Sequence, residues 1–178
     1  MSDSEVASED ASSSATYLTI KTFTEAIAAV DPQQAFGKPS KLWIAFAHFY
    51  ETHPDAEDLE NANLLFHKAS LLSYKSSDEL SSVYCAWAEM HIRHRNYDSA
   101  VKILEHACQG TRPSKKKTEE DEKTKRPTSL HANLKVWSFY VDLLENLGHN
   151  DQTKKAYERM MDLKIATPQT ILNYTAFL

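Results

Sequence analysis

One short pattern recurs three times in the sequence and constrains the fold more than any other feature. It reads LWIAFAHF from Leu42, VYCAWAEM from Val83 and VWSFYVDL from Val136. Each copy has an aliphatic residue, an aromatic residue, two variable residues, a second aromatic residue and then a small residue. Residues three and four apart share one helical face, so each copy predicts a helix that packs through an aromatic stripe. The aromatic pairs are Trp43 and Phe46, Tyr84 and Trp87, and Trp137 and Tyr140, and the small partners are Ala47, Ala88 and Val141.

A second pattern follows each copy and predicts the other helix of a hairpin. It places three residues at spacings of four and three, which keeps them on one helical face. The segment TILNYTAF repeats the first-helix pattern once more through Ile171, Tyr174 and Phe177. The second-helix positions are Ala62, Phe66 and Ala69, then Ala100, Leu104 and Ala107, then Thr153, Tyr157 and Met160.

These paired patterns predict the fold class. A two-helix unit of this kind buries its apolar face only by stacking on neighbouring units. The chain is therefore predicted to be all-α, a superhelical solenoid of antiparallel helical hairpins. The aromatic residues of each first helix should wedge against the next helix, so Trp43, Trp87 and Trp137 are expected to be largely buried.

Composition and turn residues agree with helices joined by short loops. Only three Gly occur in 178 residues, which favours helices over turn-rich sheets. Capping boxes are predicted at Thr22 with Glu25 and at Ser76 with Glu79, and Thr167 before Pro168 predicts another helix start. The other helices are predicted over 22–30, 41–52, 59–72, 78–94, 97–108, 131–147 and 151–163.

The segments outside the patterns define a tail and an insert. Residues 1–15 are acidic and Ser-rich and are expected to be disordered, because they carry little apolar surface. Residues 16–178 are expected to form the repeat array, about three repeats with a flanking half at each end. Residues 111–130 are polar and charged and contain two Pro, so they are interpreted as a loop insert. The helix before the insert is predicted to end at Gly110, and the helix after it is predicted to end at Gly148. This insert explains why the third copy of the pattern lies farther along the chain than the second.

The insert also carries a concentrated run of charges. Two basic clusters flank an acidic core, Glu119–Glu122, which predicts a solvated, self-neutralising loop. A nuclear-import signal stays open, because two basic clusters fit an import receptor. Direct RNA contact also stays open, although the interleaved acids repel phosphate and no aromatic residue is present to stack on a base. The basic residues are Lys115, Lys116, Lys117, Lys123, Lys125 and Arg126.

No constellation of residues predicts catalysis or cofactor binding. A P-loop, a dinucleotide fingerprint and paired carboxylates are missing, and Cys85 lacks the surroundings of a nucleophile. We therefore expect no enzyme activity, no cofactor and no small-molecule substrate. His91 and His94 lie one turn apart without further ligands at metal-binding spacing, so no metal is expected. Cys85 and Cys108 are expected to be buried, reduced thiols.

Charge and hydropathy exclude further classes of partner. The net charge is −5 and the pI about 5.9, which disfavours a general phosphate-binding surface. The N-terminus lacks the apolar core of a signal peptide, and no apolar run approaches the roughly 18 residues that span a bilayer. We therefore expect no membrane partner.

The repeat type and several longer segments resemble one family. Aromatic pairs three apart, without the Leu-Gly step of tetratricopeptide repeats, resemble the half-a-TPR, or HAT, repeat. Four stretches are similar to consecutive segments of the Syf-type HAT-repeat pre-mRNA-splicing factors of the crooked-neck-like superfamily. They are VDPQQAFGKPSKLWIAFAHFYE (30–51), LSSVYCAWAEMHIRHRNYDSAVKIL (80–104), LKVWSFYVDLLENLG (134–148) and LKIATPQTILNYTAFL (163–178).

The resemblance implies a function and a location. It implies a non-catalytic protein–protein scaffold in pre-mRNA splicing, part of the Prp19-associated, intron-binding complex of the spliceosome, and hence a nuclear protein. The implied partners are other spliceosomal proteins, including crooked-neck-like HAT proteins. Because the family has many more repeats, the chain is expected to be a fragment. Two alternatives remain: another HAT or TPR adaptor in RNA processing or chaperone docking, and direct RNA contact through the basic loop.

Overall fold

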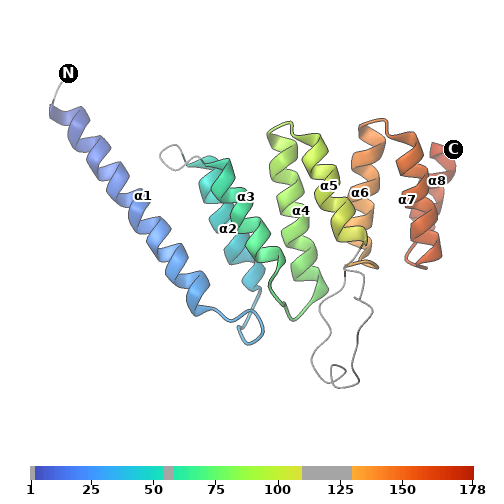
Figure 1. Cartoon of the computed structure of the whole chain (residues 1–178), viewed down its shortest axis with the longest axis horizontal. Coiled ribbons are helices and arrows are strands. Elements are labelled where there is room, and N and C mark those ends of the chain that lie inside the picture. Colours follow the sequence, from blue (N-terminus) through green and yellow to red (C-terminus); the bar gives the residue numbers. More distant parts are fainter. Residues whose placement is uncertain (1–2, 54–57, 110–129) are drawn as a thin grey trace. The chain divides into compact units, whose positions relative to one another are not determined.

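The computed structural model describes residues 3–53, 58–109 and 130–178, and every regular element in those ranges is an α-helix (Figure 1). The chain divides into two compact units, one ending at Lys75 and the other beginning at Ser76. Because every regular element in the described ranges is a helix, the predicted all-α fold class is confirmed. The first unit contains α1 (Asp3–Ala29), α2 (Pro39–Thr52) and α3 (Leu59–Ser70). The second unit contains α4 (Ser77–Arg93), α5 (Tyr97–Gln109), α6 (Leu134–Asn146), α7 (Asn150–Asp162) and α8 (Pro168–Phe177).

Each copy of the paired pattern forms one helical hairpin. Helix α2 packs against α3 in the first unit, and α4 packs against α5 and α6 against α7 in the second (Figure 1). The hairpins of the second unit also contact one another, because α6 packs on both α5 and α4. The two flanking helices pack on their neighbours in the same way, α1 on α2 and α8 on α7.

A recurring turn ends three helices of the second unit. The second residue after the helix has a positive φ in each case: Arg95 at 58°, Gly148 at 73° and Lys164 at 58°. The next residue then donates its backbone N–H to the carbonyl five residues earlier, for example from His149 to Leu144 at 3.0 Å. This is the geometry of a Schellman C-cap, which satisfies carbonyl groups that the helix leaves unpaired. The predicted helix end at Gly148 is confirmed, and Gly110 lies outside the described residues.

Side-chain caps start most of the helices after α1. The carboxylate of Asp58 accepts from two backbone N–H groups at the start of α3, both at 3.0 Å. Ser76 caps α4 as predicted, although its hydroxyl accepts from Asp78 rather than from Glu79. Thr167 caps α8 through a full capping box with Thr170, which confirms the predicted start at Thr167-Pro168. Such a cap stabilises a helix by roughly 0.5–2 kcal/mol.

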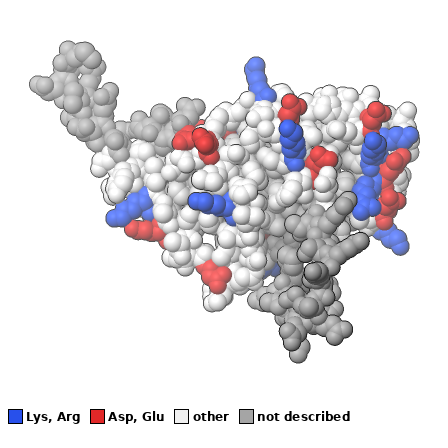
Figure 2. All heavy atoms as spheres, in the orientation of Figure 1, with Lys and Arg blue, Asp and Glu red and all other residues white. Residues whose placement is uncertain are grey.

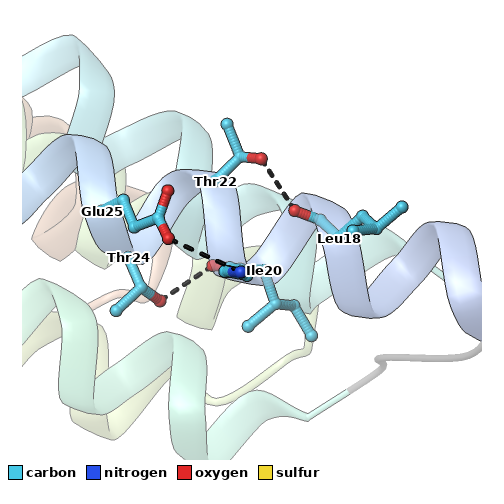
Figure 3. Close-up of polar contacts among 6 residues, drawn as sticks. Leu18, Ile20, Thr22, Thr24 and Glu25 are labelled. Atoms are coloured by element: carbon cyan, nitrogen blue, oxygen red, sulfur yellow. Dashed lines mark hydrogen bonds and ion pairs between the residues drawn. The ribbon is translucent and has the colours of Figure 1, made fainter.

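Helix α1 is longer than predicted and differs from two expectations. It begins at Asp3, inside the segment expected to be disordered, and no Gly or Pro interrupts it before Ala29. The predicted capping box at Thr22 is wrong, because the Thr22 hydroxyl donates to the carbonyl of Leu18 at 2.8 Å (Figure 3). Thr24 donates to Ile20 in the same way. Hydroxyl bonds to the fourth preceding carbonyl belong to residues inside a helix rather than at its start.

Candidate functional site

The first-helix positions of the repeat lie on the packed side of α2, α4 and α6. The small residues are the most enclosed, with Ala47 and Ala88 fully buried and Val141 only 2% exposed. A small side chain at a helix crossing lets two backbones approach and increases apolar contact between the helices. Of the aromatic positions, Phe46, Tyr84, Trp137 and Tyr140 are buried, whereas Trp43 and Trp87 are half-buried.

The three tryptophans therefore differ from the expectation that all would be largely buried. Trp137 is 5% exposed, and its indole N–H donates to the carbonyl of His131 at 2.8 Å. Its ring also makes an edge contact with Tyr140, with centroids 6.2 Å apart. Trp87 contacts Tyr84 at the same centroid distance but keeps part of its ring in solvent. A Trp side chain is large enough that sharing a repeat position with Phe or Tyr does not bury it completely.

The second-helix positions all lie in the core. Full burial of one such Leu, Phe or Met side chain contributes roughly 1.5–3 kcal/mol to folding. This face therefore supplies much of the apolar stabilisation of each hairpin. No residue of the set exceeds 3% exposure: Ala62, Phe66 and Ala69 in α3, Ala100, Leu104 and Ala107 in α5, and Thr153, Tyr157 and Met160 in α7.

Stacked aromatic rings join successive helices at both flanking positions. Tyr157 of α7 stacks on Tyr174 of α8, with ring centroids 4.9 Å apart and planes 24° apart. Phe23 of α1 stacks on Phe46 of α2, also at 4.9 Å and with planes 8° apart. In both pairs the middle residue of the second-helix pattern meets the residue at the second aromatic position of the next first helix. Offset or tilted ring pairs of this kind add about 0.5–1.5 kcal/mol beyond their burial.

The sequence predicts Phe23 on the apolar face of a flanking helix with Ile27 and Val30, but its equivalence to the middle residue of the second-helix pattern was not predicted, although a signal for it exists. Thr19, Phe23 and Ala26 have the same spacing as Thr153, Tyr157 and Met160 in α7. The C-terminal part of α1 is thus equivalent to a second helix that precedes the first hairpin. A search for the second-helix pattern upstream of Trp43 would have found it.

A hydrogen bond holds the central aromatic of α7. The phenol of Tyr157 donates to Oε1 of Glu145 on α6 at 2.6 Å. Burial, followed by this hydrogen bond, raises the pKa of Tyr157 above its ordinary value. The bond therefore connects the two helices of the hairpin and keeps the phenol protonated. In the preceding hairpin, the hydroxyl of Tyr84 lies 3.4 Å from Nδ1 of His106.

The two cysteines are buried free thiols, which confirms the prediction for both. Burial raises the pKa of Cys85 to about 11. Burial also raises the pKa of Cys108, with a smaller contribution from the neighbouring Cys85. Since the thiolate is the nucleophilic form, these surroundings oppose a catalytic role for either residue.

The remaining chemical candidates do not assemble into a site within the described part of the chain. Burial lowers the pKa of His91, and the nearby His94 lowers it further. No group of three or more His, Cys, Asp or Glu side chains in the described ranges could hold a metal ion. None of the described helices is long and apolar enough to cross a membrane.

The six basic residues of the insert, Lys115 to Arg126, lie outside the described residues. The surface that is described carries charges of both signs. On the face shown in Figure 2, Lys and Arg side chains alternate with Asp and Glu and do not gather into one basic patch. Such a surface lacks the concentrated positive potential that nucleic-acid-binding domains use.

Comparison with known proteins places these features in one family. The profile described as "Pre-mRNA-splicing factor Syf1/CRNKL1 C-terminal HAT repeat" matches residues 32–178. Pre-mRNA-splicing factor SYF1 is 43% identical to this chain in Rattus norvegicus and 42% in Homo sapiens, over 159 residues. Each alignment covers 89% of this chain and 18% of the relative. Pre-mRNA-splicing factor cwf3 of Schizosaccharomyces pombe is 40% identical, over 89% of this chain and 20% of its own length.

The chain thus spans about a fifth of the length of the curated relatives it matches. The profile match includes all three hairpins and α8, and it leaves out α1. Its range contains all three copies of the first-helix pattern and the helices that they form. The chain belongs to the Syf1/CRNKL1 family of HAT-repeat proteins.

Proposed function

We propose that this chain is a non-catalytic scaffold segment that binds other proteins in pre-mRNA splicing. The observation that carries the proposal is the family match over three complete hairpins, since the matched relatives are named pre-mRNA-splicing factors. Stacked hairpins present long helical faces, and solenoids commonly use such faces to bind other proteins. The segment would therefore act through its surface rather than through a catalytic centre.

The chemistry of the described side chains supports a role without catalysis. Titratable groups in active sites usually have pKa values that favour their reaction. Here the buried groups shift the other way, because burial keeps the thiol of Cys85 and the phenol of Tyr157 protonated. Their partners are structural as well, since Tyr157 joins α7 to Glu145 of α6.

The location of the scaffold follows from the same family. We place it in the nucleus, within the Prp19-associated, intron-binding complex of the spliceosome, with crooked-neck-like HAT proteins among its partners. Protein partners are favoured over RNA because the face shown in Figure 2 mixes both charge signs. The net charge of −5 also opposes binding to a phosphate backbone.

An affinity purification tests the proposal directly. The tagged 178-residue chain is incubated with nuclear extract, with and without RNase, and crooked-neck-like and Prp19-associated proteins are quantified by immunoblot. We expect both to be recovered equally in the two arms. Loss of both proteins after RNase would show that RNA makes the connection. Recovery of neither protein in either arm would refute the scaffold assignment for this segment.

Two variants test whether recovery of the partners depends on the folded state of the second unit. Trp137→Ala should unfold much of the second unit, because Trp137 is buried there. Glu158→Gln changes one exposed residue on α7 and should leave the fold unchanged. We expect recovery of the partners to fall for the first variant and to persist for the second.

A further inference from the structure

A small pocket lies in the second unit, where α6, α7 and the start of α8 meet. Its volume is about 150 Å³, and its lining comes from all three helices. Buried apolar side chains form part of that lining: Val141, Tyr157 and Met160 are each at most 2% exposed. Drug-sized ligands occupy sites of about 300–1,000 Å³, so this pocket has room for one side chain rather than for such a ligand.

Polar groups with unused hydrogen-bonding capacity lie at the rim of the pocket, where Asp142 and Asn173 are exposed to solvent and Ser138 is half-buried. The carboxylate of Asp142 makes no hydrogen bond or ion pair with any described residue, and only its backbone carbonyl accepts a bond, from Asn146. Asn173 accepts a bond from Gln169 at 2.8 Å, but its own amide N–H groups have no acceptor among the described residues. Ser138 likewise makes no side-chain hydrogen bond within the described ranges. The pocket therefore offers a carboxylate, a hydroxyl and amide donors.

The charge of Asp142 has no counter-charge within the pocket. No Lys or Arg is among the residues that line it. Partial burial raises the pKa of Asp142, and the nearby carboxylate of Glu145 raises it further. Glu145 is itself fixed by the phenol of Tyr157, so it cannot turn away without breaking that bond. A cation at the rim would offset the repulsion between the carboxylates of Asp142 and Glu145.

An arginine side chain matches both parts of the pocket. Its methylene groups can pack on apolar surface while the guanidinium remains at the polar edge. The planar guanidinium donates two parallel hydrogen bonds to one carboxylate, which suits Asp142. The free amide N–H groups of Asn173 are then available to a backbone carbonyl of the same peptide.

We propose that the pocket bounded by Asp142 and Asn173 binds an arginine side chain presented by an extended segment of a partner protein. The inference rests on the proposed protein–protein role and names the chemistry that such a partner would bring. Asp142 supplies the charged contact at the exposed rim and Ser138 a further acceptor, while the buried side chains of Val141 and Met160 close the floor of the pocket.

Peptide titration followed by NMR tests the proposal on the whole 178-residue chain. The probe is acetyl-Gly-Arg-Gly-amide, and the matched control peptide carries citrulline, which has nearly the same shape but no charge. We expect saturable shifts of the backbone amides of Ser138, Asp142 and Asn173 with the arginine peptide. The citrulline peptide should bind at least about tenfold more weakly, since a tenfold ratio corresponds to 1.4 kcal/mol. Absence of saturation, or equal binding of both peptides, would overturn the proposal.

Two single substitutions identify the carboxylate responsible. Asp142→Asn removes the charge with little change in shape, and it should weaken arginine binding at least about tenfold while the remaining amide spectrum stays unchanged. Glu158→Gln removes one exposed negative charge from α7 outside the pocket and should leave binding within about twofold. Equal weakening by the two variants would show a general charge effect and would refute the site. The peptide titration and the affinity purification test different claims. If the arginine peptide does not bind but splicing proteins are still recovered after RNase, the arginine site is refuted and the scaffold proposal stands.

Discussion

Truncation of Trp137 to Ala should destabilise the second unit far more than the same truncation at Trp87. Trp137 is the first aromatic of its copy of the pattern and Trp87 the second of its own, so the two substitutions remove the same side chain from two first helices of that unit. Trp137 is 5% exposed and donates its indole N–H to His131 at 2.8 Å, whereas Trp87 is half-buried. The difference between the two variants therefore measures the greater burial of Trp137 together with its hydrogen bond to His131.

The expected loss follows from the contacts of Trp137. Removing a buried Trp side chain costs about 3–5 kcal/mol through lost transfer energy and the cavity left behind. A more conservative variant, Trp137→Phe, keeps much of the ring but loses the hydrogen bond to His131, which contributes about 0.5–1.5 kcal/mol. We expect Trp137→Phe to fall between the parent chain and Trp137→Ala. Trp87→Ala should cost roughly half as much as Trp137→Ala, because much of its ring is already in water.

Urea unfolding followed by far-UV circular dichroism measures these losses. Amide hydrogen exchange of α6 gives the free energy of opening of the second unit alone. This separate value is needed if the two units unfold separately. A loss below about 1 kcal/mol for Trp137→Ala would refute the reasoning, since that is within the range of an ordinary surface substitution. A larger loss for Trp87→Ala than for Trp137→Ala would also refute it.

Three further predictions concern ionisation, exchange and the insert. Burial raises the pKa of Cys85 from 9.0 to about 11 and that of Tyr140 from 10.0 to about 12, so the folded state keeps both protons longer than the unfolded state. Stability in urea should therefore fall as the pH rises above about 9, and Cys85→Ala should remove part of that fall. Helix α8 has no buried residue, so its amides should exchange fastest among the second-unit helices by mass spectrometry. Replacing residues 111–130 with a short Gly/Ser linker should hardly change the thermal midpoint, because each doubling of loop length costs only about 0.6 kcal/mol. The same replacement should reduce nuclear entry of a fusion too large to diffuse, whereas unchanged entry would exclude an import signal there.

The hairpins could be predicted because each of their positions is encoded locally. Spacings of three and four residues determine which side chains share a helical face. All nine second-helix positions identified by this spacing, the first being Ala62 and the last Met160, lie in the core. Caps at Ser76 and Thr167 were predictable for the same reason, since the cap residue and its partner are neighbours in sequence.

Other features depend on information that a local pattern lacks. Thr22 with Glu25 has the spacing of a capping box, but the same Thr inside a helix bonds to the fourth preceding carbonyl instead. The exposure of Trp87 depends on how much of a large ring its neighbours cover. The pocket at Asp142 joins α6 to Asn173 of α8, residues brought together only when α8 packs beside the hairpin. Its lining could therefore be identified only after the helices had been placed.

The positive-φ turns at Arg95, Gly148 and Lys164 limit how the length of this chain can vary. Each turn fixes the last residue of one helix and hence the rotation at which the next helix starts. One residue inserted before such a turn would rotate the preceding helical face by about 100°, which would carry a side chain such as Leu143 or Met160 out of the core. Insertions and deletions should therefore be selected against within the hairpins and accumulate in the connection between α5 and α6. That connection is where the sequence already has its longest stretch without a repeat position.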